Sequence, residues 1–187
     1  MSAGILLLGL TACTKVLLFD AATSGQPEDV RDLIDKGADV NAKNYGDQTA
    51  LMWAAKYGQI DVVRVLIDKG ADVNMKTDDS LTALYVAARY GHVDVVRVLL
   101  EKGADVNATT GHGVTALMIA AYNGHADIVR VLLENGADIS AKTDHNATAL
   151  IAACAGQHDD IVKILTEAED MTWLEKSDGN WNLSDLP

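Results

Sequence analysis

The chain has 187 residues, of which 49% are hydrophobic, and a formal net charge of -12. This length suffices for one folded domain. The acidic charge argues against nucleic-acid binding and against attraction to anionic lipid, since both need a positive surface. It allows a basic protein partner, although an acidic composition is also a common route to solubility.

Residues 1–15, MSAGILLLGLTACTK, contain an apolar run that is too short to span a bilayer. The stretch from Leu10 to Cys13, LTAC, resembles the lipobox of bacterial lipoproteins, which implies cleavage before Cys13 and lipidation of its sulfur. We therefore expect a lipoprotein signal segment and a lipid-anchored protein on the periplasmic side of a bacterial cell envelope. Because no Lys or Arg precedes the apolar run, an apolar N-terminal extension of a cytoplasmic protein remains the alternative.

The rest of the chain repeats with a period of 33 residues. The sequence Thr-Ala-Leu starts at Thr49, Thr82, Thr115 and Thr148, and Gly-Ala-Asp starts at Gly37, Gly70, Gly103 and Gly136. A fixed period of this length indicates stacked supersecondary units rather than one globular core. The predicted repeats cover about 16–48, 49–81, 82–114, 115–147 and 148–169, and a tail follows at 170–187.

The first repeat, 16–48, differs from the others at three positions. Asp20, Asp29 and Asp32 stand where later repeats carry apolar residues that pack against the preceding unit. A terminal repeat has no preceding unit, so these positions should meet water and form a polar cap. Pro27 is expected at the start of the second helix, where its missing N–H does no harm.

The repeat that begins at Thr82 is the most regular. Thr82 is the predicted N-cap of a helix over 83–90, Gly91 ends that helix, and a second helix covers 93–101. Residues 105–113 should then project as a hairpin-like finger. The fourth finger position, which favours a left-handed backbone, is Asp47, Ser80, Gly113 or Asn146.

The fifth repeat, 148–169, is expected to be the C-terminal cap. Gln157 takes the place of the glycine between the two helices, and Cys154 aligns with alanines of a packed helix, so we expect Cys154 to be a small buried residue. The tail carries Trp173 and Trp181. We expect it to fold back over the last repeat, with a partner-binding tail and simple disorder as alternatives.

The unit from Thr82 to Val114, TALYVAARYGHVDVVRVLLEKGADVNATTGHGV, resembles an ankyrin repeat. The resemblance extends over about 16–169 and departs from the family in one respect, because alanine replaces the usual proline after each Thr. It implies an all-α ankyrin-repeat solenoid of five helix-turn-helix repeats with hairpin-like fingers.

Catalytic and metal-binding chemistry finds no support in the sequence. His92, His125 and His158 recur at one repeat position, where the resemblance implies a structural hydrogen bond, and Asp39, Asp72, Asp105 and Asp138 belong to the repeated Gly-Ala-Asp. The sequence has no phosphate-binding loop, no Gly-x-Ser-x-Gly and no His-Glu-x-x-His. We expect no enzyme activity, no cofactor and no metal.

In the family, partners bind the surface made by the fingers and the exposed side of each repeat's first helix, here called the concave face. Carried over to this chain, the resemblance implies a protein-binding site at Tyr45, Lys56, Tyr57, Asp78, Asp79, Leu81, Arg89, Tyr90, His112, Val114, Tyr122, Asn123, Asp144 and His145. Tyr and Arg are enriched at interface hot spots, which favours the tyrosines and Arg89.

The predicted function is therefore non-catalytic binding of a protein partner by a monomer, and the acidic charge fits a basic partner. By analogy with exported bacterial ankyrin proteins, an envelope-anchored immunity protein or an accessory protein of an envelope enzyme is expected. A cytoplasmic regulator or scaffold without an export signal is the alternative, and a structural or chaperone-like lipoprotein without a unique partner is another.

Overall fold

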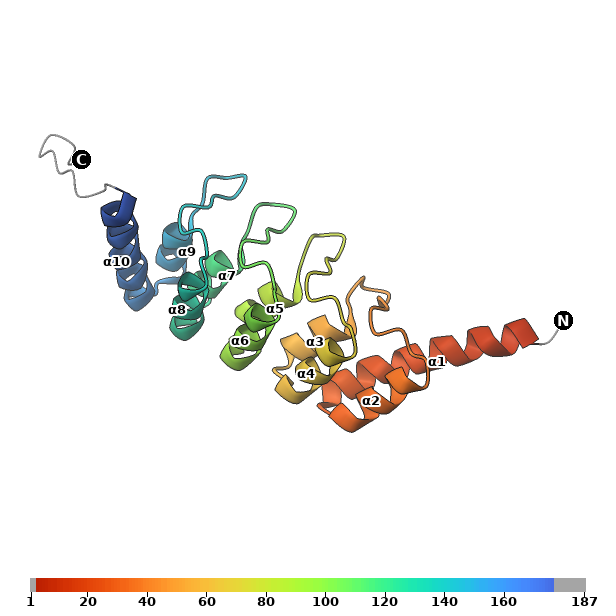
Figure 1. Cartoon of the computed structure of the whole chain (residues 1–187). Coiled ribbons are helices and arrows are strands. Elements are labelled where there is room, and N and C mark those ends of the chain that lie inside the picture. Colours follow the sequence, from red (N-terminus) through yellow and green to blue (C-terminus); the bar gives the residue numbers. More distant parts are fainter. Residues whose placement is uncertain (1–2, 177–187) are drawn as a thin grey trace, which may run out of the picture.

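The computed structural model describes the backbone of residues 3–176 and the side chains of residues 14–170. Ten α-helices in this part of the chain form five helix-turn-helix pairs that stack side by side, with the fingers all projecting in one direction (Figure 1). The pairs are α1 (Ala3–Ser24) with α2 (Pro27–Asp35), α3 (Ala50–Lys56) with α4 (Ile60–Asp68), α5 (Ala83–Tyr90) with α6 (Val93–Glu101), α7 (Ala116–Tyr122) with α8 (Ala126–Glu134), and α9 (Ala149–Gly156) with α10 (Asp159–Lys176). The predicted all-α fold of five repeats is confirmed.

A threonine starts the first helix of every repeat after the first one. Its side chain accepts a hydrogen bond from the backbone N–H three residues later, at 3.3 Å for Thr49, 3.2 Å for Thr82, 3.3 Å for Thr115 and 3.4 Å for Thr148. This bond satisfies one of the N–H groups that a helix start leaves unpaired. The predicted N-cap at Thr82 and the predicted bounds of α5 and α6 are confirmed.

The fingers turn at a residue with a left-handed backbone, as predicted. The φ angles are 59° at Asp47, 62° at Ser80, 77° at Gly113 and 59° at Asn146. Serine adopts this conformation less readily than Asp, Asn or Gly. Its occurrence at Ser80 shows that the stacked framework, and not the local residue preference alone, sets the finger geometry.

The N-terminal repeat has the expected polar outer face. Asp20, Asp29 and Asp32 are exposed and line a shallow hollow of about 280 Å³, and Pro27 occupies the first turn of α2. The helix α1 is longer than the first helix of any other repeat. It has 22 residues and continues without a break across the predicted boundary between residues 15 and 16.

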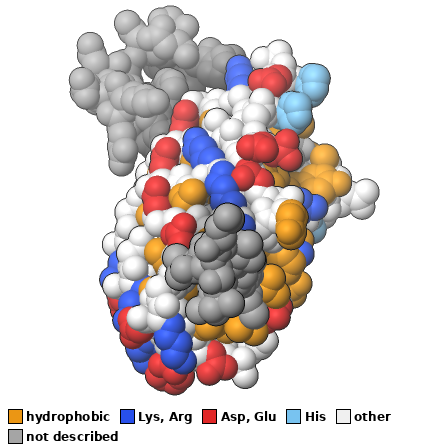
Figure 2. All heavy atoms as spheres, turned by 90° about the vertical axis from the view of Figure 1, so that its right-hand side faces the viewer, with side chains coloured by type: hydrophobic (Ala, Val, Ile, Leu, Met, Phe, Trp, Pro, Cys, Tyr) orange, Lys and Arg blue, Asp and Glu red, His pale blue; other side chains and the backbone are white. Residues whose placement is uncertain are grey.

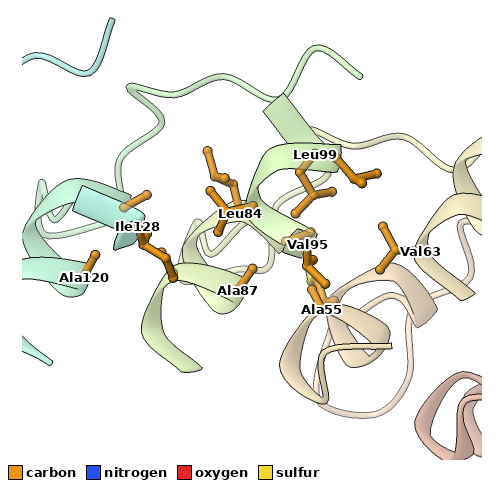
Figure 3. Close-up of a cluster of buried hydrophobic side chains, with 14 of the residues drawn as sticks. Ala55, Val63, Leu84, Ala87, Val95, Leu99, Ala120 and Ile128 are labelled. Atoms are coloured by element: carbon orange, nitrogen blue, oxygen red, sulfur yellow. The ribbon is translucent and has the colours of Figure 1, made fainter. Parts of the chain in front are cut away.

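The core runs through the stack as a continuous layer between neighbouring repeats. In Figure 3, Ala55 and Val63 of the second repeat face Val95 of the third, and Ala87 lies towards Ala120 of the fourth. The two paired alanines of α3, α5 and α7 are all 0% exposed. Small side chains at these positions let adjacent first helices approach closely, so each repeat completes the burial of the next.

In the C-terminal repeat, the predicted burial of Cys154 is wrong. Cys154 is exposed, although the aligned Ala55, Ala88 and Ala121 are 0% exposed. The reason is that these alanines are covered by the following repeat, and no sixth helix pair follows α9 and α10 in the described residues. Gln157 takes the left-handed position between the two helices, with a φ of 62°.

The last helix, α10, has 18 residues and crosses the predicted boundary between the repeat and the tail at residue 169. The side chain of Trp173 and all of Trp181 lie outside the described residues, so the expected packing of the tail stays a prediction. Within residues 14–170, where side chains are described, no helix combines the length and the apolar character that crossing a membrane requires.

The stacking predicts that a core leucine contributes more to the free energy of unfolding than any surface residue of the same helix. Leu99 in α6 is 0% exposed, whereas Arg97 is exposed. We expect Leu99→Ala to lower the free energy of unfolding by about 2–5 kcal/mol, because it removes buried apolar atoms and leaves a cavity. Urea unfolding followed by circular dichroism at 222 nm measures this, and Arg97→Ala should change stability by no more than about 0.5 kcal/mol. Equal effects of the two changes would contradict the packing described above.

Candidate functional site

Asparagine side chains join the base of each finger to the next one. The Oδ1 atoms of Asn41, Asn74 and Asn107 accept hydrogen bonds from backbone N–H groups 31 residues later, at 2.9, 2.8 and 2.8 Å. Their Nδ2 atoms donate to glycine carbonyls of the following repeat, at 3.4, 3.0 and 3.3 Å. The fingers are therefore held in a fixed row.

The acidic ladder of the repeats is structural, as predicted. Each aspartate of the Gly-Ala-Asp sequence accepts a hydrogen bond from the backbone N–H two residues later, at 2.9 or 3.0 Å, and these aspartates are Asp39, Asp72, Asp105 and Asp138. The carboxylates stabilise the turn that leads into the finger.

The recurring histidines are also structural. The Nε2 atoms of His92, His125 and His158 hydrogen-bond a backbone carbonyl of the preceding repeat, at 2.9, 3.2 and 3.1 Å. Gln59 makes the same contact in the second repeat, to the carbonyl of Thr23 at 3.0 Å. The predicted hydrogen-bonding role of the three histidines is confirmed, and it adds a second set of bonds between repeats.

A charged pair fastens the first finger to the second. Lys43 Nζ lies 2.9 Å from Asp47 Oδ1 and donates to the carbonyl of Lys76 at 2.8 Å. The other carboxylate oxygen of Asp47 accepts a hydrogen bond from the backbone N–H of Asp78. The hydrogen bond from Lys43 holds the pKa of Asp47 below its usual value, and the bond from Asp78 acts in the same direction.

Backbone bonds fasten the later fingers. The N–H of Gly111 donates to the carbonyl of Asp79 at 3.1 Å, and the N–H of Asp144 donates to the carbonyl of His112 at 3.2 Å. His112 Nδ1 also lies 3.8 Å from Asp144 Oδ2, with both side chains largely exposed. The finger tips thus form a connected row that carries exposed acidic groups.

The first helices of the second and third repeats carry a cluster of aromatic rings around one ammonium group. The distances from Lys56 Nζ to the ring centroids are 5.1 Å for Trp53, 5.4 Å for Tyr57 and 5.6 Å for Tyr90. Trp53 and Tyr57 stack at 5.9 Å, and the Arg89 guanidinium lies 5.9 Å from the Tyr90 ring. These distances are within the range of cation–π attraction, which favours positions of both cations beside the rings.

The fourth and fifth repeats present an apolar hollow instead. It has a volume of about 270 Å³ and lies between α7 and α9. Its walls include Val114, Met118, Ile119, Tyr122, Ile151 and Ala152. Tyr122 and Ile151 are each 52% exposed at its border. One end of the concave face therefore offers cations and aromatic rings, and the other end offers apolar contact.

Figure 2 views the stack from its N-terminal end. Hydrophobic side chains gather on one side, at the right of this view, whereas Lys and Arg mix with Asp and Glu along the opposite lower edge. On the face seen in this view, the exposed apolar groups are therefore concentrated on one side.

The remaining predicted binding residues lie in three settings. Six of them are exposed on the fingers, where the Tyr45 side chain is fully exposed: Tyr45, Asp78, Asp79, His112, Asp144 and His145. Leu81 is half-buried at a finger base. Asn123 is exposed, but its Nδ2 donates to the Ile119 carbonyl of its own helix at 2.8 Å.

Sequence reasoning missed Trp53 and Ile151 as members of this surface. Trp53 aligns with Val86 and Ile119, which indicated a core position, and Ile151 aligns with the buried Met52 and Met118. In the structure Trp53 is half-buried and stacks on Tyr57, and Ile151 is open to solvent. The size of tryptophan beside a tyrosine four residues later was the available signal.

The described residues include no group of three or more His, Cys, Asp or Glu side chains that could hold a metal ion. Two family models match the chain: one described as ankyrin repeats (3 copies) matches residues 18–110, and one described as ankyrin repeats (many copies) matches residues 99–153. No curated protein matches the sequence.

The finger geometry predicts how Asp47 titrates. Because its pKa is depressed in the folded protein, the bonds of Asp47 stabilise the fold above the unfolded pKa, and this contribution is lost as the pH falls through the folded pKa. We expect Lys43→Met to raise the pKa of Asp47 towards its usual value, as measured by carboxyl ¹³C NMR titration. Lys102→Met, which removes a lysine paired with Asp68 in another repeat, should leave the Asp47 titration unchanged. An unchanged Asp47 titration in Lys43→Met would contradict this assignment.

Proposed function

Because the chain belongs to the ankyrin-repeat family, whose members are generally protein–protein interaction modules, we propose that it binds a protein partner through its concave face. The binding is rigid docking without chemistry. The inter-repeat hydrogen bonds support this proposal, since a surface that is already ordered loses little conformational entropy when a partner binds.

The exposed aromatic groups are the observation that carries the proposal. Tyr57, Tyr90 and Tyr122 are 44%, 46% and 52% exposed at the C-terminal ends of successive first helices. Tyrosine supplies a large contact area at a low entropic cost and is common among residues that dominate binding energy. Lys56 and Arg89 beside the rings can donate hydrogen bonds to carbonyl or carboxylate oxygens of a partner.

The charge pattern narrows the class of partner. Asp78, Asp79 and Asp144 are exposed at the finger tips, and the chain carries a net charge of -12. A basic protein surface is complementary to the fingers and is attracted over a distance, which raises the association rate at low salt. An apolar side chain of the same partner fits the hollow between α7 and α9.

We also propose that Cys13 carries a lipid that anchors the protein on the periplasmic side of a bacterial envelope. The buried residues Leu18, Ala21 and Ala22 follow Cys13 in the chain, so cleavage before Cys13 keeps the contacts that they make with the stack. An anchored module of this kind suits an immunity protein or an accessory protein of an envelope enzyme. A cytoplasmic regulator with an apolar N-terminal extension is the alternative that the anchor test separates.

The concave face is tested by removing the tyrosines together. We expect the triple change Tyr57→Ala, Tyr90→Ala and Tyr122→Ala to weaken binding of a partner captured by the unchanged protein by about 100-fold, since several hot-spot contacts are lost. The dissociation constant is measured by calorimetry with the purified partner.

The matched control is Arg64→Ala, Arg97→Ala and Arg130→Ala, which changes three exposed residues spaced by 33 residues on α4, α6 and α8. It should change affinity by less than about threefold, apart from any long-range charge effect on the association rate. A partner that binds the tyrosine variant as tightly as the unchanged protein would place the site elsewhere.

The anchor is tested by labelling cells with radioactive palmitate. We expect label on the unchanged protein and on Cys154→Ser, and none on Cys13→Ser, because only the sulfur of Cys13 follows the lipobox-like sequence. Absence of label from all three proteins would remove the anchor and favour the cytoplasmic alternative.

A further inference from the structure

Two cations on the concave face keep their hydrogen-bond donors available. Lys56 Nζ lies 5.6 Å and Arg89 Cζ 5.9 Å from the centroid of the same ring, that of Tyr90. Among residues 14–170, neither cation pairs with a carboxylate, whereas Lys69 and Lys102 each pair with an aspartate of the preceding repeat. The N–H groups of Lys56 and Arg89 can therefore bind an acceptor that another molecule supplies.

The neighbouring rings favour an anionic acceptor at this place. Tyr57 and Tyr90 already hold the ammonium group of Lys56 beside them, so a cation from a partner would be repelled. A carboxylate is attracted by both positive groups and forms charge-assisted hydrogen bonds with them. Lys56 is half-buried, and the rings beside it reduce contact with water, which strengthens the attraction.

The finger tips restrict where a carboxylate of the partner can lie. Asp78 and Asp79 are exposed on the finger of the second repeat, and Asp144 is exposed on that of the fourth. An acidic side chain placed against these groups is repelled, and such repulsion selects one alignment of a partner over others. The ends of α3 and α5, with Lys56 and Arg89, are therefore the favourable place for it.

The apolar hollow provides a second fixed point on the same face. It has a volume of about 270 Å³, lies between α7 and α9, and has Val114, Ile119 and Ala152 among its walls. Lys56 and Arg89 belong to α3 and α5, so the hollow lies two repeats further along the stack. At about 8–10 Å between packed helices, the two places are about 16–20 Å apart. An extended chain covers this distance in about five or six residues, at about 3.3 Å per residue.

We propose that the concave face recognises an extended segment of its protein partner in which an acidic side chain and a large apolar side chain are five or six residues apart. The carboxylate binds Lys56 and Arg89, and the apolar side chain fills the hollow between α7 and α9. This inference rests on the proposed function and adds the chemistry and the spacing of the segment that is bound. The partner's surface around that segment remains basic, where it faces the acidic finger tips.

Synthetic peptides with blocked ends test the charge and the spacing in the absence of the partner. The first peptide has Glu at its centre and Leu six positions away on both sides, with Ser and Gly elsewhere, so that it fits in either chain direction. A second peptide has Gln in place of Glu. A third has the same length and composition, with each Leu three positions from the Glu. NMR titration of the ¹⁵N-labelled full chain measures the three dissociation constants.

We expect the first peptide to bind about tenfold or more tightly than either of the others, because each of those loses one of the two contacts. In the variant Lys56→Met with Arg89→Met, the Glu and Gln peptides should bind within about twofold of each other. The matched control Arg64→Met with Arg97→Met removes the same charge from α4 and α6 and should keep the full difference. Circular dichroism at 222 nm checks that both variants remain folded.

Equal affinities for the Glu and Gln peptides would overturn the carboxylate site, and equal affinities for the two spacings would overturn the spacing. The whole proposal is wrong if none of the peptides binds. These outcomes differ from failure of the proposed function, which is measured with the purified partner and the tyrosine variant. A partner that requires the tyrosines, together with peptides that show no discrimination, would leave the concave face as the binding site and remove only this inference.

Discussion

The structure depends on one constraint: a helix pair of this sequence is apolar on two sides and can bury those sides only against its neighbours. The alanines at the contact between first helices are 0% exposed because the next repeat lies directly on them. Their small size brings adjacent backbones close enough for Gln59 and the three aligned histidines to reach a carbonyl of the preceding repeat. Packing therefore sets the spacing, and the hydrogen bonds between repeats follow from that spacing.

The same constraint determines which residues are available to contact a partner. Positions buried between neighbouring repeats must stay apolar, whereas the finger tips and the exposed side of the first helices are free to carry other side chains. There the chain carries Lys56 among three aromatic rings, and an apolar hollow near Tyr122. Since the framework fixes these groups, recognition can differ from one repeat to the next without any change in the fold.

The repeat period predicted the fold well, because each signal occurs several times in phase. The bounds of α5 and α6, the Thr82 cap and the left-handed finger residues all followed from local chemistry that the repeats share. Prediction failed at Cys154, where position within a repeat was taken to imply burial. This position is buried by the repeat that follows. Cys154 aligns with buried alanines, but in the described residues no repeat follows the last one to cover it. Trp53 was not predicted as part of the surface, because its aligned residues are smaller, whereas its ring is half-buried and stacks on Tyr57.

The two ends of the stack show how a repeat array can terminate by different means. At the N-terminal end, three aspartates replace the apolar residues that the internal repeats carry at the aligned positions, and their side chains are exposed to water. At the C-terminal end, Ile151 and Cys154 kept the character of an internal repeat and are exposed. Exposed apolar surface beside a hollow favours contact with another apolar surface. The aspartate face at the other end is hydrated and needs no such contact.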